Sequence, residues 1–345
     1  MHPLVKGGIE RYVHDVGVYL LERGHEVDLL LPGCPRSKLK SVDGMRLKYA
    51  TGLGTLLSNP IVPGLGMRMR RAEWDVAHFH LPLPSAVLSW AIWGDRRPYV
   101  VTYHSDIVRQ RRFLPLYAPL LKRFLRRASA VLATSPVYVR TSPFLRCLDN
   151  VGVVPIGVDI GRFSPGSAAP GEYYLFVGRF RGYKGIEVLM EAWSRLKEAR
   201  LVMVGGGPLE EWVKATVSSR RLNVELAGTV DDNRLLELYR GARALILPSV
   251  RRSEAYGMVQ LEAMACRTPV ISSSLDTGVR WVNRDGETGM TVPPGDANAL
   301  ADAVLALGDD GLRSRLAAGA LRRARSRFEA KAAFGLVEEA LERSL

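Results

Sequence analysis

Short, unbroken apolar runs alternate with longer stretches of helical periodicity along both halves of the chain. The apolar runs are rich in Val, Ile and Leu and end in Gly, Pro or Ser, which is typical of strands buried on both faces. They predict strands at 26–32, 75–81, 98–104, 130–135, 151–157, 173–178, 200–206, 224–228, 244–249 and 269–274. Helices are predicted between them, among others at 9–24, 186–199, 235–242 and 258–266. This alternation favours parallel sheets covered by helices on both faces.

A stretch rich in Gly, Pro and Ser, GVDIGRFSPGSAAPGEY at 157–173, separates the two series of strands and helices. A chain of 345 residues is long enough for two domains. We therefore predict an α/β protein with two Rossmann-like, doubly wound domains at 1–155 and 156–325. Ligands bind outside the carboxyl ends of such strands, so the predicted site lies where the two domains face each other. The last segment, 326–345, is predicted to be a helix that packs back toward the first domain.

The cysteine count and the hydropathy pattern argue against a disulfide-rich, zinc-binding or membrane-spanning protein. Cys34, Cys147 and Cys266 are odd in number and far apart, so they predict neither a disulfide framework nor a zinc site. The most apolar stretch, LPLPSAVLSWAIWG at 81–94, is too short and too rich in proline for a membrane span. The first residues, MHPLVKGGIERY, do not resemble a signal peptide. A cytoplasmic protein in a reducing compartment is expected.

The basic excess lies in the first half of the chain. Of a formal net charge of +13, the first 150 residues account for most, with 22 Lys and Arg against 11 Asp and Glu. The segment LYAPLLKRFLRRA predicts a basic amphipathic helix, which suits an anionic membrane surface, although a solvated helix face is the plainer alternative. No binding motif or stacking aromatic pattern supports a nucleic-acid partner. The basic clusters are Arg68, Arg70 and Arg71; Arg109, Arg111 and Arg112; and Lys122, Arg123, Arg126 and Arg127.

Two strand ends in the second half carry groups suited to a diphosphate. In VGRFRGYKG, Arg179 and Lys184 follow a predicted strand, and two cations there can make charge-assisted hydrogen bonds to phosphate oxygens. In VGGGP, Gly206 allows the backbone to approach a ligand closely. Surface charge and a plain turn are the simpler alternatives for these two motifs.

The segment VELAGTVDD predicts a third strand end with a binding role. The backbone of Thr229 and Val230 lies between a strand and a helix, where it can read the edge of a nucleobase. Asp231 or Asp232 can cap the helix that follows.

The stretch RSEAYGMVQLEAMA predicts a loop followed by a helix that begins near Gly257. The free N–H groups around Gly257, Met258 and Val259, next to Tyr256, make an anion site at the helix start.

Two carboxylates, Glu254 and Glu262, stand on either side of that helix start. A carboxylate accepts two hydrogen bonds from a vicinal diol, so the pair can hold the two sugars of one sugar nucleotide. Salt bridges to Arg251 and Arg252 are the alternative explanation for charge in an apolar segment.

Taken together, these motifs resemble those of the retaining GT-B glycosyltransferases of family 4. VGRFRGYKG, VGGGP and LPSVRRSEAYGMVQLEAMA followed by PVIS resemble donor-site motifs, the third containing E-x7-E, and VNRDGETGMTVPPGD at 282–296 matches as well. In the first half, KGGIERYVHDVGVYLLERGHEV resembles the glycine-rich loop and first helix, and FHLPLP and VVTYHSDIVRQ resemble acceptor-domain segments. The resemblance covers nearly the whole chain.

The resemblance implies a role for each matching residue. Arg179 and Lys184 would neutralise the departing diphosphate, Glu262 would hold the ribose and Glu254 would contact hydroxyls of the transferred sugar. His104 would face the sugar near the reacting carbon, as a stabilising group and not as a nucleophile.

The resemblance also implies that a loop at Gly7 and Gly8 closes over the diphosphate. Attack on the front face of the sugar would retain the anomeric configuration. No Asp-x-Asp metal motif is evident, so neither a metal nor another cofactor is expected.

The sequence departs from the family pattern at its start. Family members usually begin with a hydrophobic strand before the glycine-rich loop, whereas MHPLVK is all that precedes Gly7 here. The first strand of the first domain is therefore expected to be absent, which would leave backbone groups unpaired and a gap in the core. A truncated chain or a misassigned start site is the hypothesis that explains it.

The expected activity is hexosyl transfer from a nucleotide sugar, GDP-mannose or a UDP-sugar, to a lipid-linked or glycan acceptor in lipopolysaccharide or other surface-polysaccharide synthesis. TGVRWVN at 277–283 resembles mannosyl- and rhamnosyltransferases of O-antigen synthesis. The enzyme is expected at the inner face of the membrane, in peripheral contact with anionic lipid.

Two rival functions make different predictions. A dinucleotide-dependent oxidoreductase needs G-x-G-x-x-G after its first strand, and VGGGPLEE lacks that spacing. A membrane-surface or nucleic-acid binding protein that uses the basic first half would keep its salt-sensitive binding without Glu254 and Glu262.

Overall fold

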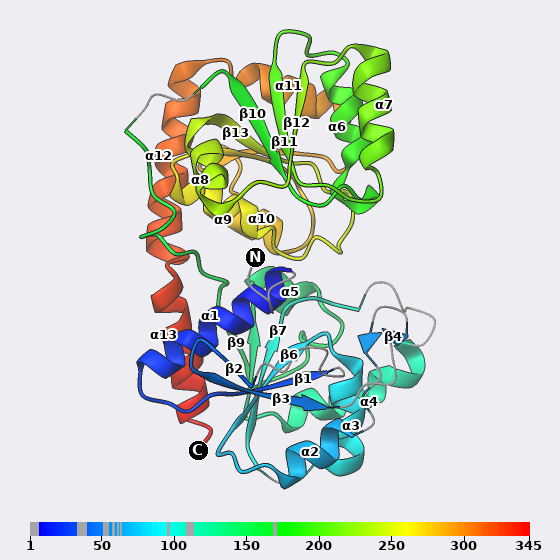
Figure 1. Cartoon of the computed structure of the whole chain (residues 1–345), viewed down its shortest axis with the longest axis vertical. Helices are drawn as coiled ribbons and strands as arrows, with labels where there is room; N and C mark the ends of the chain where they lie inside the picture. Colours follow the sequence, from blue (N-terminus) through cyan, green and yellow to red (C-terminus); the bar gives the residue numbers. More distant parts are fainter. Residues whose placement is uncertain are drawn as a thin grey trace. The chain divides into compact units, whose positions relative to one another are not determined.

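The chain forms two compact units of α/β architecture, which are described separately. The computed structural model describes residues 7–32, 40–50, 55–56, 59–60, 62, 64–94, 97–107, 114–167 and 171–345. Unit 1 comprises Met1–Val154 and Lys331–Leu345, and unit 2 comprises Pro155–Ala330 (Figure 1). Parallel sheets in both units confirm the predicted fold class.

Unit 1 alternates strands and helices along the chain. Its elements are α1 (Gly8–Glu22), β1 (Asp28–Pro32), β2 (Ser41–Val42), β3 (Met45–Ala50), β4 (Thr55–Leu56), β5 (Asn59–Pro60), α2 (Leu65–Arg71), β6 (Ala77–Leu81), α3 (Pro84–Trp93), β7 (Tyr99–Tyr103), α4 (Leu114–Arg127), β8 (Ala130–Ala133), α5 (Pro136–Thr141) and β9 (Val151–Val153), with α13 (Ala330–Glu342) at the end of the chain.

The described strands of unit 1 do not form one continuous sheet. Four parallel strands pair in the order β6-β7-β8-β9, a separate sheet has the order β1-β3-β2, and β4 pairs with β5. Within the described residues, β1 pairs only with β3 and β6 pairs only with β7. No strand precedes α1 in the part of the chain that the structure describes, and residues 1–6 lie outside it.

Helix α13 belongs to unit 1 because it packs on α1. The carboxylate of Glu338 accepts hydrogen bonds from Tyr19 (3.2 Å) and from Nε of Arg23 (3.2 and 3.3 Å), and it lies 3.0 Å from Nε2 of His25. Phe334 adds an edge contact with the ring of Tyr12. The hydrogen bonds to Glu338 offset the cost of burying its charge, since this residue is only 7% exposed.

Unit 2 has one six-stranded, all-parallel sheet in the order β12-β11-β10-β13-β14-β15. Its elements are β10 (Tyr173–Val177), η2 (Gly182–Lys184), α6 (Ile186–Trp193), β11 (Arg200–Val204), α7 (Glu210–Arg220), β12 (Val224–Gly228), α8 (Asp232–Gly241), β13 (Ala242–Leu247), α9 (Met258–Ala265), β14 (Val270–Ser273), α10 (Gly278–Val282), β15 (Gly289–Val292), α11 (Ala297–Ala306) and α12 (Asp310–Arg327).

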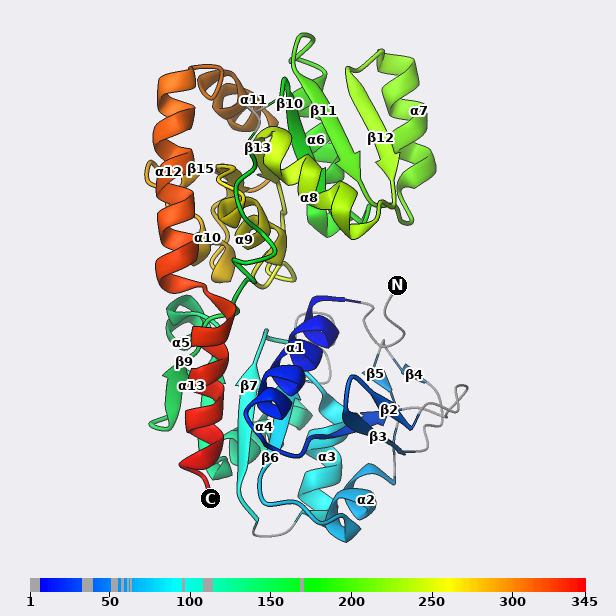
Figure 2. The ribbon, with the colours of Figure 1, turned by 60° about the vertical axis from the view of Figure 1, so that its left-hand side comes forward.

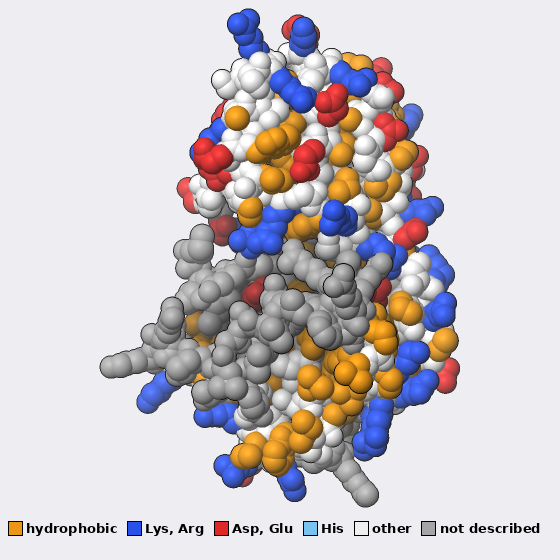
Figure 3. Space-filling model, turned by 90° about the vertical axis from the view of Figure 1, so that its right-hand side faces the viewer, with side chains coloured by type: hydrophobic (Ala, Val, Ile, Leu, Met, Phe, Trp, Pro, Cys, Tyr) orange, Lys and Arg blue, Asp and Glu red, His pale blue; other side chains and the backbone are white. Residues whose placement is uncertain are grey.

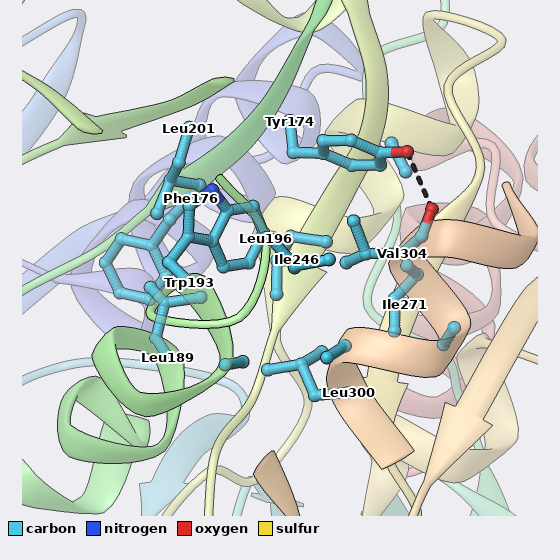
Figure 4. Close-up of a cluster of buried hydrophobic side chains, with 14 of the residues drawn as sticks. Tyr174, Phe176, Leu189, Trp193, Leu196, Leu201, Ile246, Ile271, Leu300 and Val304 are labelled. Atoms are coloured by element: carbon cyan, nitrogen blue, oxygen red, sulfur yellow. Dashed lines mark hydrogen bonds between the residues drawn. The ribbon is translucent and has the colours of Figure 1, made fainter. Parts of the chain in front are cut away.

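The core of unit 2 explains why its strands are apolar on both faces. One face of the sheet packs on α6, α7 and α11, with Trp193 and Leu300 among the buried contacts (Figure 4). In this core the hydroxyl of Tyr174 donates to the carbonyl of Val304 at 2.8 Å. On the opposite face Leu247 packs against Val279 of α10. Strands covered on both sides need no polar alternation.

Five of the described strands lie outside the predicted apolar runs, and three of them, β2, β4 and β5, are only two residues long. Strand β3, MRLKYA, alternates buried and exposed positions because only one side is covered, and β15, GMTV, is short and lies at the edge of its sheet. None of the described helices is long and apolar enough to cross a bilayer.

Candidate functional site

The order of strands in unit 2 brings the predicted donor-binding residues of this unit to the carboxyl ends of the strands. Proceeding along the chain, β10, β11 and β12 are added to one side, whereas β13, β14 and β15 are added to the other. Strand β10 therefore has β11 on one side and β13 on the other. This is a topological switch point, where the loops after two neighbouring strands diverge and leave room for a ligand.

Lys184 and Glu254 meet at this switch point. The Nζ atom of Lys184, after β10, lies 2.5 Å from Oε2 of Glu254, after β13. The hydroxyl of Ser249 donates to the same oxygen at 2.8 Å. The side chains of the pair are only 11% and 9% exposed. Among the described residues, the ion pair of Glu254 is with Lys184 and not with Arg251 or Arg252, the alternative drawn from sequence neighbours; Arg252 donates to the carbonyl of Asp276.

The ion pair keeps Lys184 charged despite its burial. Burial alone would lower the pKa of Lys184, but the charge of Glu254 and its hydrogen bond outweigh that effect and raise it. The second carboxylate oxygen of Glu254, Oε1, makes no hydrogen bond to the residues that the structure describes. That oxygen is available to accept from a ligand hydroxyl.

A tight turn at Gly185 sets the position of Lys184. The turn η2 ends at Gly185, whose φ of 71° and ψ of 32° are left-handed. A Cβ at this position would collide with the carbonyl oxygen of Pro248, so only glycine allows the turn to pack against the end of β13. The N–H of Val250 donates to the carbonyl of Tyr183 at 2.9 Å and fixes the two loops together.

The glycines of VGGGP serve the protein's own packing as much as ligand access. A Cβ on Gly205 would collide with the carbonyl of Gly178, and a Cβ on Gly207 would lie 2.9 Å from the carbonyl of Phe180. At Gly206, by contrast, the nearest atom to a Cβ is a carboxylate oxygen of the flexible Glu210 side chain. The carbonyl of Gly206 accepts from the N–H of Phe180 at 2.9 Å.

Helix α9 begins where the sequence predicts an anion site. Gly257 is its N-cap with φ of 70° and ψ of 64°. Helix geometry leaves the N–H groups of Met258 and Val259 without partners inside the helix. Tyr256 is buried, and its hydroxyl donates to the carbonyl of Ile156 at 3.3 Å.

Gln260, which the sequence analysis did not select, stabilises the start of α9. Its Nε2 donates to the carbonyl of Tyr256 at 2.6 Å, while its buried Oε1 has no hydrogen-bond partner among the described residues. A glutamine inside an apolar helical segment was the only signal that could have identified it.

Glu262 is half-buried on the second turn of α9. Its Oε2 accepts from the hydroxyl of Tyr239 at 2.6 Å, which leaves Oε1 without a hydrogen bond to the described residues. Both predicted carboxylates therefore hold one oxygen on a protein donor and keep the other free. Tyr239 also went unrecognised in the sequence, because it belongs to helix α8.

The remaining predicted donor contacts of unit 2 are exposed or half-buried. Arg179 and Thr229 are exposed, and Val230 is half-buried. They follow β10 and β12, so they lie at the carboxyl ends of the strands, as Lys184 does. Asp231, and not Asp232, caps α8 by accepting from the N–H of Arg234 at 2.8 Å.

His104 lies in a cluster of three histidines in unit 1. It follows β7 directly, and its Nε2 is 3.2 Å from Nδ1 of His80 on β6. His78, two residues earlier on the same face of β6, is hydrogen-bonded to Thr102 at 2.7 Å. Helix α1 lies over these strands (Figure 2). The ring centroid of Tyr12 on α1 is 5.0 Å from that of His104. Spacing of two on a strand, H-F-H, is the signal that could have identified His78 and His80.

The other predicted residues of unit 1, Gly7 and Gly8, are exposed at the start of α1, where Gly7 is the N-cap. Of the basic clusters, those on α2 and α4 are exposed. The cluster at Arg109, Arg111 and Arg112 lies outside the described residues.

The histidine cluster predicts a loss of stability in mild acid. Burial, with repulsion from His78, lowers the pKa of His104 to about 3, and burial lowers that of His78 to about 4 and that of His80 well below its usual value. Between about pH 6.5 and 4 the unfolded histidines therefore bind protons that the folded ones do not. Stability should fall with pH in this window, by up to about 1.4 kcal/mol per pH unit for each histidine.

Urea denaturation of the full chain at pH 7, 6 and 5 measures this slope. His78→Asn, which removes one titrating group, should flatten it. His14 acts in the opposite direction, because its hydrogen bonds to Asp15 and Asp43 outweigh burial and raise its pKa, so His14→Asn should steepen the slope. An unchanged denaturation midpoint from pH 7 to pH 5 in the wild type would contradict the prediction.

Comparison with known proteins agrees with the motifs and the fold. The family described as Glycosyltransferase Family 4 matches residues 6–162, and the family described as Glycosyl transferases group 1 matches residues 159–323. O-antigen chain mannosyltransferase C of Escherichia coli is 34% identical over 88% of this chain and 85% of its own length. D-rhamnosyltransferase WbpZ of Pseudomonas aeruginosa is 38% identical over 68% of this chain and 64% of its own length.

A phosphatidyl-myo-inositol mannosyltransferase of Mycobacterium leprae is 31% identical over 92% of this chain and 88% of its own length. Among solved structures, sucrose-phosphate synthase from Thermosynechococcus elongatus has a TM-score of 0.81 at 24% identity, over 98% of this chain and 93% of that one. HepE of Anabaena in complex with UDP has a TM-score of 0.79 at 19% identity, over 99% and 98% of the two chains. The structural likeness concerns the fold, which is GT-B. The chain thus belongs to the glycosyltransferases of family 4 and group 1, and its activity is glycosyl transfer.

Proposed function

We propose that the protein is a retaining hexosyltransferase that moves a sugar from GDP-mannose or a UDP-sugar to a lipid-linked or surface-polysaccharide acceptor. The observation that carries this proposal is the Lys184–Glu254 pair at the switch point of unit 2, with one oxygen of Glu254 left free. A cation beside a free carboxylate oxygen suits the diphosphate and the hydroxyl-bearing sugar of one donor molecule.

The proposed donor lies along the strand ends of unit 2. Its diphosphate would bind Lys184, Arg179 and the N–H groups at the start of α9, where two cations and a helix N-terminus replace a metal ion. The free oxygen of Glu262 would accept from the ribose. Gly206 and the backbone of Thr229 and Val230 would contact the nucleoside.

We assign the catalytic roles to Glu254 and His104. Glu254 would hold hydroxyls of the transferred sugar, and His104, kept neutral by burial, would contribute a polar group near the reacting carbon. A neutral imidazole neither repels the positive charge that develops on the sugar ring nor competes with it for the departing phosphate. The donor's phosphate would assist removal of the acceptor proton, and Gly7 and Gly8 would close over the diphosphate.

The acceptor class follows from the relatives, whose names refer to O-antigen chains and to phosphatidyl-myo-inositol. Both kinds of acceptor belong to envelope assembly. We propose that the protein works at the cytoplasmic face of the membrane and needs no nucleic-acid partner.

Thermal unfolding of the full chain with a panel of UDP-, GDP- and ADP-sugars tests the donor assignment. A donor at about a hundred times its dissociation constant should add about 2.7 kcal/mol of stability. Glu262→Ala should weaken binding of that nucleotide about 10- to 100-fold, the value of a hydrogen bond to a charged group. Donor turnover that is unchanged in Glu254→Ala would contradict the proposal. A product of inverted configuration would contradict retention, and loss of activity in EDTA would contradict the absence of a metal.

A further inference from the structure

Helix α3 is apolar all round, yet one of its faces is open. Its sequence, PSAVLSWAIW, contains no charged residue. Ala86, Val87 and Trp90 are buried against the sheet, whereas Leu88 is 48% and Ile92 is 70% exposed. A helix that is hydrophobic on every side normally lies in a protein core or in lipid. Only half of this helix is in a core.

The open face continues onto both neighbouring helices. Helix α2 packs closely on α3, because a Cβ on Gly66 would lie 2.6 Å from the carbonyl of Ser89 and 2.9 Å from the Cβ of Trp93. Figure 3 shows hydrophobic side chains gathered on this part of unit 1. We call this surface the α3 patch; it comprises Met67 (37% exposed), Leu88, Ile92, Trp93 (36%) and Leu116 (86%), from α2, α3 and α4.

Basic side chains surround the α3 patch. Arg68, Arg70 and Arg71 are exposed on α2, and Lys122, Arg123, Arg126 and Arg127 are exposed on α4. Within the described residues none of these seven cations forms an ion pair, and Glu73 and Asp75, after α2, are the nearest acidic residues in sequence. Arg127 and Arg97 line one hollow of about 360 Å³ with Trp90, so the basic end of α4 adjoins α3 itself.

We propose that the α3 patch inserts into the interfacial region of an anionic lipid bilayer, with the cations of α2 and α4 on the headgroup phosphates. A contiguous exposed apolar surface marks an interaction site, and a basic border selects an anionic partner. A second copy of this chain fits less well, because a two-fold contact would bring the same cations together from both subunits. The α3 patch would hold the enzyme beside a lipid-linked acceptor. This purpose rests on the proposed function.

Co-sedimentation of the full chain with vesicles, without nucleotide or acceptor, tests the proposal. Binding should be strong to phosphatidylcholine vesicles that contain phosphatidylglycerol, weak to phosphatidylcholine alone, and weaker in high salt. Ile92→Glu should reduce the partition coefficient about tenfold or more, since it puts a charge where an apolar side chain would enter the bilayer. Leu305→Glu is the matched control, because Leu305 lies on α11 of unit 2 and is 66% exposed. This variant should bind vesicles as the wild type does.

A second pair of variants separates the charges from the apolar face. Arg123→Glu with Arg126→Glu should reduce binding to phosphatidylglycerol vesicles more than tenfold and remove most of its salt dependence. Equal binding by wild type and Ile92→Glu would overturn the proposal. So would a concentration-dependent dimer that Ile92→Glu dissolves while vesicle binding persists, because the patch would then bind a second copy. Ile92→Glu should show the same donor-induced thermal shift as the wild type. If the donor assignment is wrong, the wild type itself will show no such shift, whatever its binding to vesicles.

Discussion

Glu254→Ala is expected to reduce the rate of sugar transfer by about 10²- to 10³-fold and to destabilise unit 2 at the same time. In its proposed role Glu254 holds the transferred sugar, so the rate should fall when this buried carboxylate is lost. Stability falls because Lys184, with 11% of its side chain exposed, loses the carboxylate that offsets the cost of burying its charge. Breaking a buried ion pair from one side costs about 3–5 kcal/mol.

A double-mutant cycle with Lys184→Met separates the two effects. If the pair is coupled as its geometry indicates, Lys184→Met combined with Glu254→Ala should cost less stability than the sum of the single changes, since no charge is left unpaired. Activity should remain low in the double variant, because both proposed donor contacts are gone. Urea denaturation and a transfer assay on each variant give the two readouts.

The control for this cycle is an exposed ion pair of the same unit. Lys214 lies 2.8 Å from Glu211, but the two side chains are 50% and 87% exposed. Glu211→Ala should change neither the denaturation midpoint nor the rate measurably. Strictly additive losses in the Lys184 and Glu254 cycle would show that the pair is not coupled.

Gly185→Ala should destabilise unit 2 by about 3 kcal/mol or more. Two costs combine at this position: a non-glycine residue at a φ of 71° is strained by about 1–2 kcal/mol, and the new Cβ would collide with the carbonyl of Pro248. Relief of the collision requires η2 to move away from the end of β13. Lys184 would then lose its position beside Glu254, so donor affinity should fall together with stability.

Gly286→Ala isolates the first of these costs. Gly286 has nearly the same φ, 69°, but a Cβ there meets no atom within 4 Å. Its loss of stability should be about 1–2 kcal/mol, the strain alone, with donor binding unchanged. Chemical denaturation of both variants and a nucleotide titration would measure the difference. Equal losses at the two positions would mean that the contact with Pro248 is not important.

The parts of the fold that could be read from sequence are those that local patterns encode. The runs at 173–177 and 201–204 lack charged residues because both sheet faces of unit 2 are covered. Unbroken apolar runs do not predict strand β3, MRLKYA, because a half-covered strand alternates polar and apolar residues. The glycines, the helix start at Gly257 and the E-x7-E spacing were equally local, so the donor-site motifs could be predicted.

The sequence by itself determined the family and the parallel α/β architecture, and it selected the candidate donor-site residues, because hydrophobic period and motif spacing are properties of neighbours along the chain. The tertiary structure alone decided which groups meet. Glu254 pairs with Lys184 and not with the adjacent arginines, because β13 lies beside β10 in the sheet. Tyr239 reaches Glu262 because α8 contacts α9, and His80 reaches His104 because β6 pairs with β7. Partners that a strand order or a helix packing brings together have no characteristic separation in sequence, so no local pattern reveals them.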